Sequence, residues 1–233
     1  MTTIRPLTAA LVLTLALAAC SQAGTPAAAP ATTATPAPAA APAAPAVTEI
    51  KITAGSYQLD PDHSGVLATW SHFGYSHPSA HFRISAGTVV WDAADPGKSS
   101  VEVTLPIAQI DTFVPALDTH LKSADFFDAG KFPNATFKST AVQLAGPNHY
   151  TVTGNLTIKD KTHPVTLDVT LNGAGKHAMT GLETLGFSAT AEVKRSDFGV
   201  AAFAPNVSDE VQLSITGEGS ISAPAAAPAA VGK

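Results

Sequence analysis

Apolar and polar residues alternate through most of the middle of the chain. In the segment 149–158, every even-numbered position from Tyr150 to Ile158 holds an apolar residue or glycine. The odd-numbered positions from 151 to 157 hold Thr or Asn. Successive side chains of a strand point to opposite faces, so this period predicts strands with one apolar and one polar face. Polar turns between such segments predict antiparallel hairpins. The other predicted strands are 64–73, 81–92, 99–107, 134–144, 164–172, 185–194 and 210–219.

The alternation stops between residues 108 and 123. Ile110, Val114, Leu117 and Leu121 recur there at helical spacing, with a proline near the first turn, where a helix tolerates it. We expect one short helix near residues 111–123, with Asp111 as its N-cap.

About eight two-faced strands must bury their apolar faces without a set of helices to cover them. A sandwich and a closed barrel both satisfy this requirement, and spacing alone does not choose between them. Small residues recur on the inward faces, which favours a barrel with internal space, and a barrel of eight strands can hold one small ligand. The small inward positions are Ala68, Gly154, Ala189, Ala191 and Gly217.

The N-terminal segment has the layout of an export signal. One charge, Arg5, precedes an apolar run that ends at Ala19 and is short for a membrane span of about 20 residues. Leu17–Cys20 resembles a bacterial lipobox, and Cys20 is the only cysteine of the 233 residues; cleavage after Ala18 is the alternative. We expect residues 1–19 to be a lipoprotein signal peptide and Cys20 to be lipidated. Ser21 follows Cys20, as in bacterial lipoproteins that are sorted to the outer membrane. From this resemblance we expect a periplasmic protein anchored at the outer membrane rather than at the inner membrane.

Composition divides the rest of the chain. Residues 20–48 are almost entirely Ala, Pro and Thr and predict an extended tether, and residues 223–233 repeat this composition and predict a disordered tail. Residues 49–222 are long enough for one domain with a sizeable core.

Charge and motifs exclude several classes of function. The net charge is −5, without a basic stripe, so nucleic acid is not an expected partner. His77 and His81 are four residues apart, but on a strand this separation is about 13 Å, too far for shared metal ligation. Asp125 and Asp128 could be imagined as a catalytic acid and base, but the simpler interpretation is that both are solvent-exposed charges. We expect no metal, no cofactor and no enzymatic activity.

Four segments together resemble the YceI-like family. They are "YQLDPDHSGVLATWSHFGYS" (57–76), "THLKSADFFDAGKFPNATFKST" (119–140), "YTVTGNLTIKDKTHPVTL" (150–167) and "LGFSATAEVKRSDFGV" (185–200). The resemblance covers residues 56–221. One departure is Ala80-His81-Phe82, where the family usually has a glycine before the phenylalanine.

The resemblance implies an all-β fold: an extended, eight-stranded, antiparallel, lipocalin-like barrel whose apolar tunnel holds a polyisoprenoid or a similar amphipathic lipid. It implies a periplasmic binding protein that transports or stores a long apolar lipid, including an isoprenoid quinone, and catalyses no reaction. The membrane would be a further partner through the lipidated N-terminus, and the protein would be a monomer or homodimer. The alternative is a structural or stress-related envelope lipoprotein whose side chains fill the barrel.

Ten phenylalanines are spread along the chain, and four of them lie between residues 126 and 137. Adjacent residues diverge, so one of Phe126 and Phe127 is expected to face the cavity while the other pins the loop to the wall. Lysines and an arginine near the mouth could donate hydrogen bonds to a ligand head group or simply face solvent: Lys122, Lys131, Lys194 and Arg195. The predicted apolar pocket consists of Trp70, Phe73, Phe82, Phe126, Phe127, Phe137, Leu156, Phe187 and Phe198.

Overall fold

The computed structural model describes residues 48–221 of the chain. The predicted signal peptide, the lipidation of Cys20, nearly all of the tether, and the C-terminal tail lie outside the described residues.

The described part consists of ten strands, one α-helix and three short 3-10 helices. In chain order they are β1 (Gly55–Leu59), β2 (Gly65–Thr69), β3 (Ser79–Arg83), β4 (Ala86–Trp91), η1 (Pro96–Lys98), β5 (Ser100–Pro106), η2 (Ile107–Gln109), α1 (Pro115–Lys122), β6 (Asn134–Gly146), β7 (His149–Ile158), β8 (Lys161–Lys176), β9 (Glu183–Lys194), η3 (Arg195–Phe198) and β10 (Glu210–Ile221).

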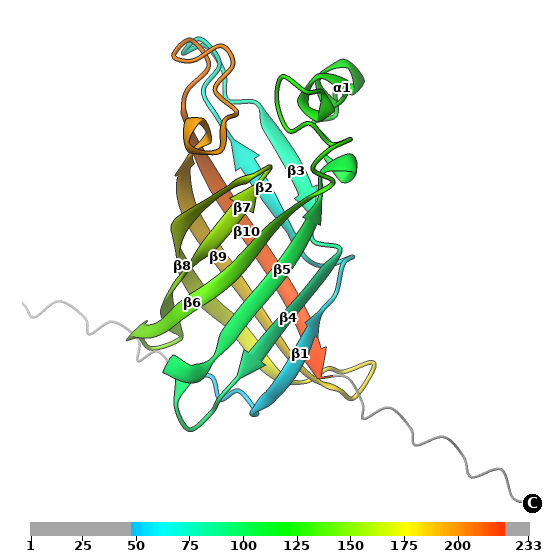
Figure 1. Ribbon diagram of the computed structural model, residues 1–233. Coiled ribbons are helices and arrows are strands. Elements are labelled where there is room, and N and C mark those ends of the chain that lie inside the picture. The colour runs from blue at the N-terminus through cyan, green and yellow to red at the C-terminus, as the bar shows by residue number, and fades with distance from the viewer. Residues whose placement is uncertain (1–47, 222–233) are drawn as a thin grey trace, which may run out of the picture. The chain divides into compact units, whose positions relative to one another are not determined.

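The strands form one closed antiparallel barrel (Figure 1). Each strand from β4 to β9 pairs with the next strand along the chain. β10 then pairs with β1 near its C-terminal end and with β2 near its N-terminal end. Since β4 pairs with β1 and β3 with β2, the segments β1–β2 and β3–β4 each occupy one strand position in the wall. Ten strands therefore make eight positions, which confirms the predicted eight-stranded barrel.

A side chain bridges the break between β1 and β2. The carbonyl of Glu218 in β10 accepts hydrogen bonds from the backbone N–H of Asp60, at 2.8 Å, and from Oγ of Ser64, at 3.3 Å. The N–H of Glu218 donates to the same Oγ at 3.1 Å. Ser64 thus supplies the partners that an uninterrupted ladder would give Glu218, and the closing contact of the barrel continues across the turn.

The structure corrects several predicted boundaries. β1 was not predicted as a strand, the predicted strand 64–73 ends at Thr69, and the predicted strand 81–92 is divided between β3 and β4. The helix begins at Pro115 with Val114 at its N-cap position, so the assignment of Asp111 as N-cap is wrong. The Asp111 carboxylate instead accepts a hydrogen bond from the N–H of Phe113, at 2.8 Å.

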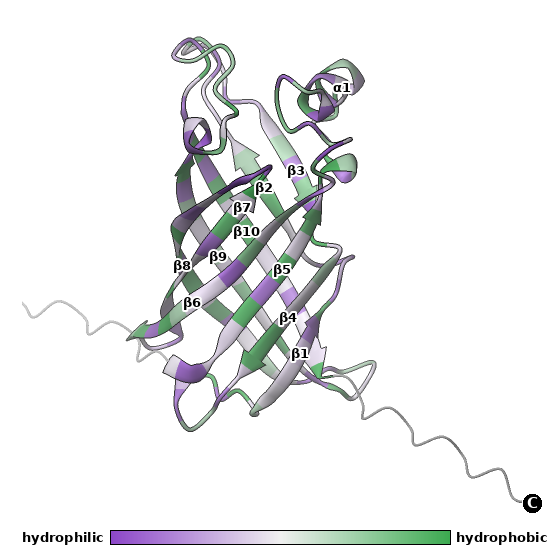
Figure 2. Ribbon diagram, viewed as in Figure 1, coloured by the Kyte–Doolittle hydropathy of each residue, from purple (hydrophilic) through white to green (hydrophobic). Residues whose placement is uncertain are grey.

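Hydrophobic and hydrophilic residues alternate along the strands, as their banding in Figure 2 shows, and apolar side chains of these strands line the interior. Buried apolar residues form two clusters. One holds Leu121 and Phe126 at the end of the barrel where α1 lies, and the other holds Tyr57 and Tyr150 at the opposite end (Figure 1). Between these two packed ends the wall encloses a cavity.

We expect Ser64→Ala to lower the free energy of unfolding by about 1–2 kcal/mol, because Ser64 is buried and the N–H of Glu218 would lose its hydrogen-bond acceptor. Chemical denaturation measures this change. Ser85→Ala is the matched control: it lies at the corresponding break between β3 and β4, but its exposed hydroxyl makes only a 3.4 Å contact with the carbonyl of Thr104. Equal stability of the two variants would show that Ser64 does not secure the closure.

Candidate functional site: an apolar cavity inside the barrel

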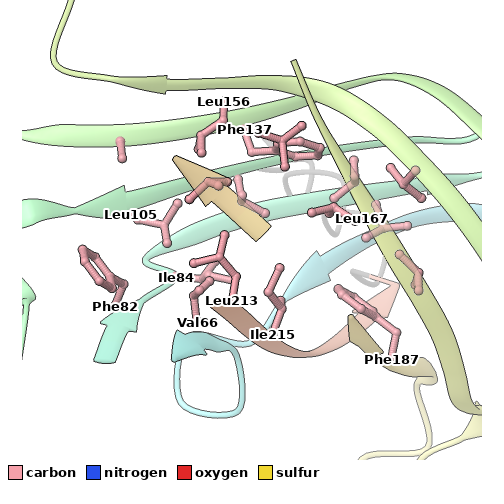
Figure 3. A pocket seen from close by; sticks show the side chains of 18 of the residues that line it. Val66, Phe82, Ile84, Leu105, Phe137, Leu156, Leu167, Phe187, Leu213 and Ile215 are labelled. Atoms are coloured by element: carbon pink, nitrogen blue, oxygen red, sulfur yellow. The ribbon is translucent and has the colours of Figure 1, made fainter. Parts of the chain in front are cut away.

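The barrel holds a cavity of about 230 Å³. Every strand except β1 contributes side chains to it. The space is therefore a property of the whole wall and not of one loop. Figure 3 shows part of the lining, where aliphatic and aromatic side chains from strands far apart in the sequence turn toward one another: Val66, Phe82, Ile84, Leu105, Phe137, Leu156, Leu167, Phe187, Leu213 and Ile215.

The lining is almost entirely hydrocarbon. Its polar side chains are Ser99, Ser100, Arg195 and the ring hydroxyl of Tyr150, apart from the indole of Trp91. Burial, with a smaller contribution from the charge of Glu49, raises the pKa of Tyr150, so its hydroxyl is neutral at physiological pH. Such a lining offers an apolar molecule a large contact surface and gives no group placed for acid–base chemistry.

Arg195 touches the cavity, but its guanidinium is held by the chain's own carbonyl groups. Nε donates to Ser208 at 2.8 Å, Nη2 to Val207 at 2.7 Å, and Nη1 to Ala202 at 2.8 Å and to Val200. Burial lowers the pKa of Arg195, and nearby Asp209 acts in the opposite direction. Four of the five guanidinium N–H groups are used in these bonds. Arg195 therefore fixes the loop that follows η3 and has little donor capacity left for a ligand.

Two inward glycines accommodate phenylalanine rings. A methyl group on Gly217 would lie 2.4 Å from the ring of Phe187, its direct cross-strand partner. A methyl group on Gly154 would lie 2.3 Å from the ring of Phe137. Each ring therefore lies against the wall in the space that the glycine leaves, as in aromatic rescue of glycine in sheets. This corrects the prediction that these glycines leave room for a ligand directly, because the room they leave is occupied.

The alanines also differ from the expectation. Ala68 lines the cavity, whereas Ala189 and Ala191 do not. Two of its phenylalanine rings, Phe137 and Phe187, leave space in the cavity because each lies against a glycine of the neighbouring strand. Only one of the five small residues contributes directly to the cavity surface.

Six of the nine predicted pocket residues line the cavity, and three lie elsewhere. Trp70 packs against the apolar cluster at the α1 end without lining the cavity. Phe73 lies in the β2–β3 loop and is half exposed. Phe126 is buried beside His120, with ring centroids 4.8 Å apart. The residues that line the cavity are Phe82, Phe127, Phe137, Leu156, Phe187 and Phe198.

The pair at the end of the helix diverges as its sequence suggested. Phe127 lines the cavity and meets Phe82 edge to face, with centroids 5.7 Å apart. The ring of Phe126 instead packs against His120 in α1 and against Phe203 in the loop before β10. Leu121, buried in the same cluster, attaches the helix to the barrel.

The three predicted head-group lysines do not line the cavity. Lys131 is exposed and lies over the ring of Phe132, with Nζ 4.9 Å from the centroid. Lys122, in the last turn of α1, is partly buried, and Lys194 is exposed at the end of β9. The lining residues that were not singled out are chiefly aliphatic, such as Leu213 and Ile215; the alternation of residues 210–219 already placed them on the inward face.

Within residues 48–221, no three His, Cys, Asp or Glu side chains gather closely enough to hold a metal ion. None of the helices in this part of the chain has the length and apolar character needed to cross a membrane.

The sequence matches the family model of the YceI-like domain over residues 57–219, so the chain belongs to this family. A UPF0312 protein of Pseudomonas fluorescens (strain SBW25) is 38% identical over 171 residues, which are 72% of this chain and 88% of the relative. Protein YceI of Salmonella arizonae is 37% identical over 168 residues, 71% of this chain and 87% of that protein.

Solved structures share the fold. Burkholderia cenocepacia BcnA superposes with a TM-score of 0.62 at 32% identity, covering 69% of this chain and 98% of BcnA. A polyisoprenoid binding domain from Saccharophagus degradans superposes with a TM-score of 0.54 at 10% identity, covering 71% of this chain and 98% of that domain. These likenesses agree with the eight-stranded, lipocalin-like barrel described above.

We expect Gly217→Ala to push the Phe187 ring off the wall and into the cavity, because the new methyl group would overlap the ring. Overpacking of this kind lowers the free energy of unfolding by about 1–3 kcal/mol. A crystal structure and chemical denaturation of the variant measure both effects. Gly186→Ala is the control, since its methyl group would meet nothing closer than a carbonyl oxygen at 3.9 Å. An unmoved Phe187 ring would contradict the account of how the cavity stays open.

Proposed function

We propose that this protein binds a long apolar lipid, such as a polyisoprenoid or an isoprenoid quinone, inside the barrel, and carries or stores it without catalysing a reaction. The observation that carries the proposal is the hydrocarbon-lined cavity in the interior of a closed barrel, at a place where an ordinary small domain has a packed core.

The chemistry of the lining suits an apolar chain. Each methylene group removed from water contributes about 0.8 kcal/mol, so a long prenyl chain can bind without any specific polar contact. An empty apolar space also deprives the atoms around it of van der Waals partners. A ligand that fills the cavity would therefore stabilise the folded barrel as well as gain binding energy.

The comparisons support the same class of ligand. The Saccharophagus degradans domain that shares the fold is described as polyisoprenoid binding. At 10% identity this similarity supports a shared fold alone. The separate support for an apolar ligand is the apolar lining of the cavity in the present protein. The cavity also argues against the alternative of a structural lipoprotein whose side chains fill the barrel.

The setting we propose follows from the N-terminal sequence. A lipidated Cys20 and the Ala/Pro-rich residues after it would tether the domain at the outer membrane, on its periplasmic side, as a monomer or homodimer. One acyl chain anchors a protein weakly, so stable attachment would need the several chains of a bacterial lipoprotein.

We expect native mass spectrometry of the freshly purified protein to show a species heavier than the chain by the mass of one apolar lipid, which organic extraction removes. A mass equal to that of the polypeptide with its own covalent modifications, in every preparation and also after incubation with octaprenol, would overturn the proposal.

Neighbouring variants in β2 test whether the cavity is the binding site. Ala68→Phe would place a ring in the cavity, since Ala68 lines it and is 6% exposed. Leu67→Phe, at the adjacent and 40% exposed position, is the matched control. The lipid-bearing species should fall strongly in the first variant and persist in the second.

A further inference from the structure

The ladder between β8 and β9 stops before the two strands end. Its register runs from Asp168 opposite Thr190 to Lys176 opposite Glu183. β8 begins at Lys161 and β9 ends at Lys194, so the segments 161–167 and 191–194 lack pairing with each other. Each segment still pairs on its other side, 161–167 with β7 and 191–194 with β10. The backbone ladder of the wall is therefore interrupted between two otherwise regular strands, and the buried side chains of Val165 and Phe198 lie at the interruption.

The gap is bounded at both ends. On one side lies the first ladder pair, Asp168 and Thr190. On the other side η3 packs against β8: the rings of Phe198 and His163 meet edge to face, 5.2 Å apart. Lys159 adds a weak hydrogen bond from Nζ to the carbonyl of Gly199, at 3.4 Å. The gap is thus a window in the side of the barrel, which we call the β8–β9 opening, and not the fraying of two strand ends.

A proline lies on the β8 edge of this opening. Proline has no backbone N–H and occurs in sheets where that side of the strand has no partner. Pro164 is paired with Asn155 of β7, and no ladder reaches it from β9. The sequence therefore removes a donor at the place where the wall lacks a neighbouring strand, and the opening is built into the chain.

A second pocket lies in the β8–β9 opening and continues toward the main cavity. Three of its residues, Val165, Val193 and Phe198, also line the main cavity. They form an apolar inner side. The exposed side chains Glu192, Lys194 and Asp197 form a charged outer rim beside Pro164, and the half-buried His163, packed on the Phe198 ring, lies between the two. From solvent inward, the residues at this place thus change from charged and hydrogen-bonding groups to hydrocarbon, and an amphipathic lipid has the same order of polar and apolar parts.

We infer that the lipid enters and leaves through the β8–β9 opening and that its polar end remains there, with the apolar chain in the cavity. This inference rests on the proposed function and adds the route and the head-group site. The rim offers donors at His163 and Lys194 and acceptors at Glu192 and Asp197. An uncharged end that both donates and accepts, such as a hydroxyl, matches this rim, whereas a diphosphate would meet two carboxylates.

A reversible cross-link tests the route. Thr166 and Glu192 are the next outward-facing positions beyond the last ladder pair, so Thr166→Cys with Glu192→Cys places thiols on the two sides of the opening. A short bifunctional thiosulfonate reagent joins them, and a reductant releases them. Asp168→Cys with Thr190→Cys is the matched control, because it staples the same strands where they already pair. Both variants are made in the full chain with Cys20→Ser.

The readout is the rate at which each protein takes octaprenol from phosphatidylethanolamine–phosphatidylglycerol vesicles. Cross-linking the opening should slow uptake by at least about tenfold, reversed by reductant, and cross-linking the control pair should leave the rate within about twofold. Equal rates before and after closure of the opening would overturn the inference while leaving the proposed function intact. Absence of uptake by the unmodified protein would instead overturn the proposed function.

The head-group site has its own test. We expect octaprenol to bind the unmodified protein with a lower Kd than octaprenyl diphosphate. The double variant Glu192→Gln, Asp197→Asn removes two negative charges from the rim, so we expect the Kd values of the two lipids to become more similar. The control Asp92→Asn removes a charge from the loop between β4 and β5, away from the rim. Tighter binding of the diphosphate by the unmodified protein would remove the polar rim from the head-group site.

Discussion

The structure depends on the pairing of β10 with two partners on one side, β1 and β2. Without this pairing the sheet would have two free edges. The sheet would then not close into a barrel, and the apolar faces of its strands would not be enclosed. With the pairing, every inward residue faces another inward residue across the barrel. Ser64 and Glu218 carry this closure across the interrupted first position of the wall.

Enclosure alone does not make a cavity, because large inward side chains could fill it. The phenylalanines leave the space open by lying over glycines of the neighbouring strands, Phe137 over Gly154 and Phe187 over Gly217. The one charged side chain in the lining, Arg195, donates its hydrogen bonds to carbonyl groups of the loop that follows it. The resulting interior selects for apolar surface and shape. If the protein binds a lipid as proposed, discrimination among lipids would come from polar groups at the boundary of the cavity, such as those at the β8–β9 opening.

Periodicity predicted the two-faced strands because each strand is exposed on one face, so the sequence of residues such as 149–158 reports which side chains point inward. The choice of a barrel over a sandwich came instead from the small inward residues and the family resemblance. Phe126 and Phe127 were separated because adjacent side chains diverge. Periodicity could not show that the inward glycines serve the rings beside them, because cross-strand register is not visible along a single chain. It missed the β8–β9 opening for a related reason: residues 161–167 and 191–194 keep their alternation whether or not they have a neighbour. The helix start moved from Asp111 because that carboxylate closes a tight turn at Phe113 instead.

The first and last strands of the described chain meet each other, and this fixes the order in which the fold can be completed. Apart from the pairings of β10 with β1 and β2, most strand contacts join consecutive strands, and such hairpins close short loops at small entropic cost. The contact of Tyr57 with Ile221 closes the longest loop in the barrel. We therefore expect it to form late, after the hairpins are in place. The interior is a product of the last step of folding, so a lipid cannot guide the earlier steps and can only hold the finished ring shut.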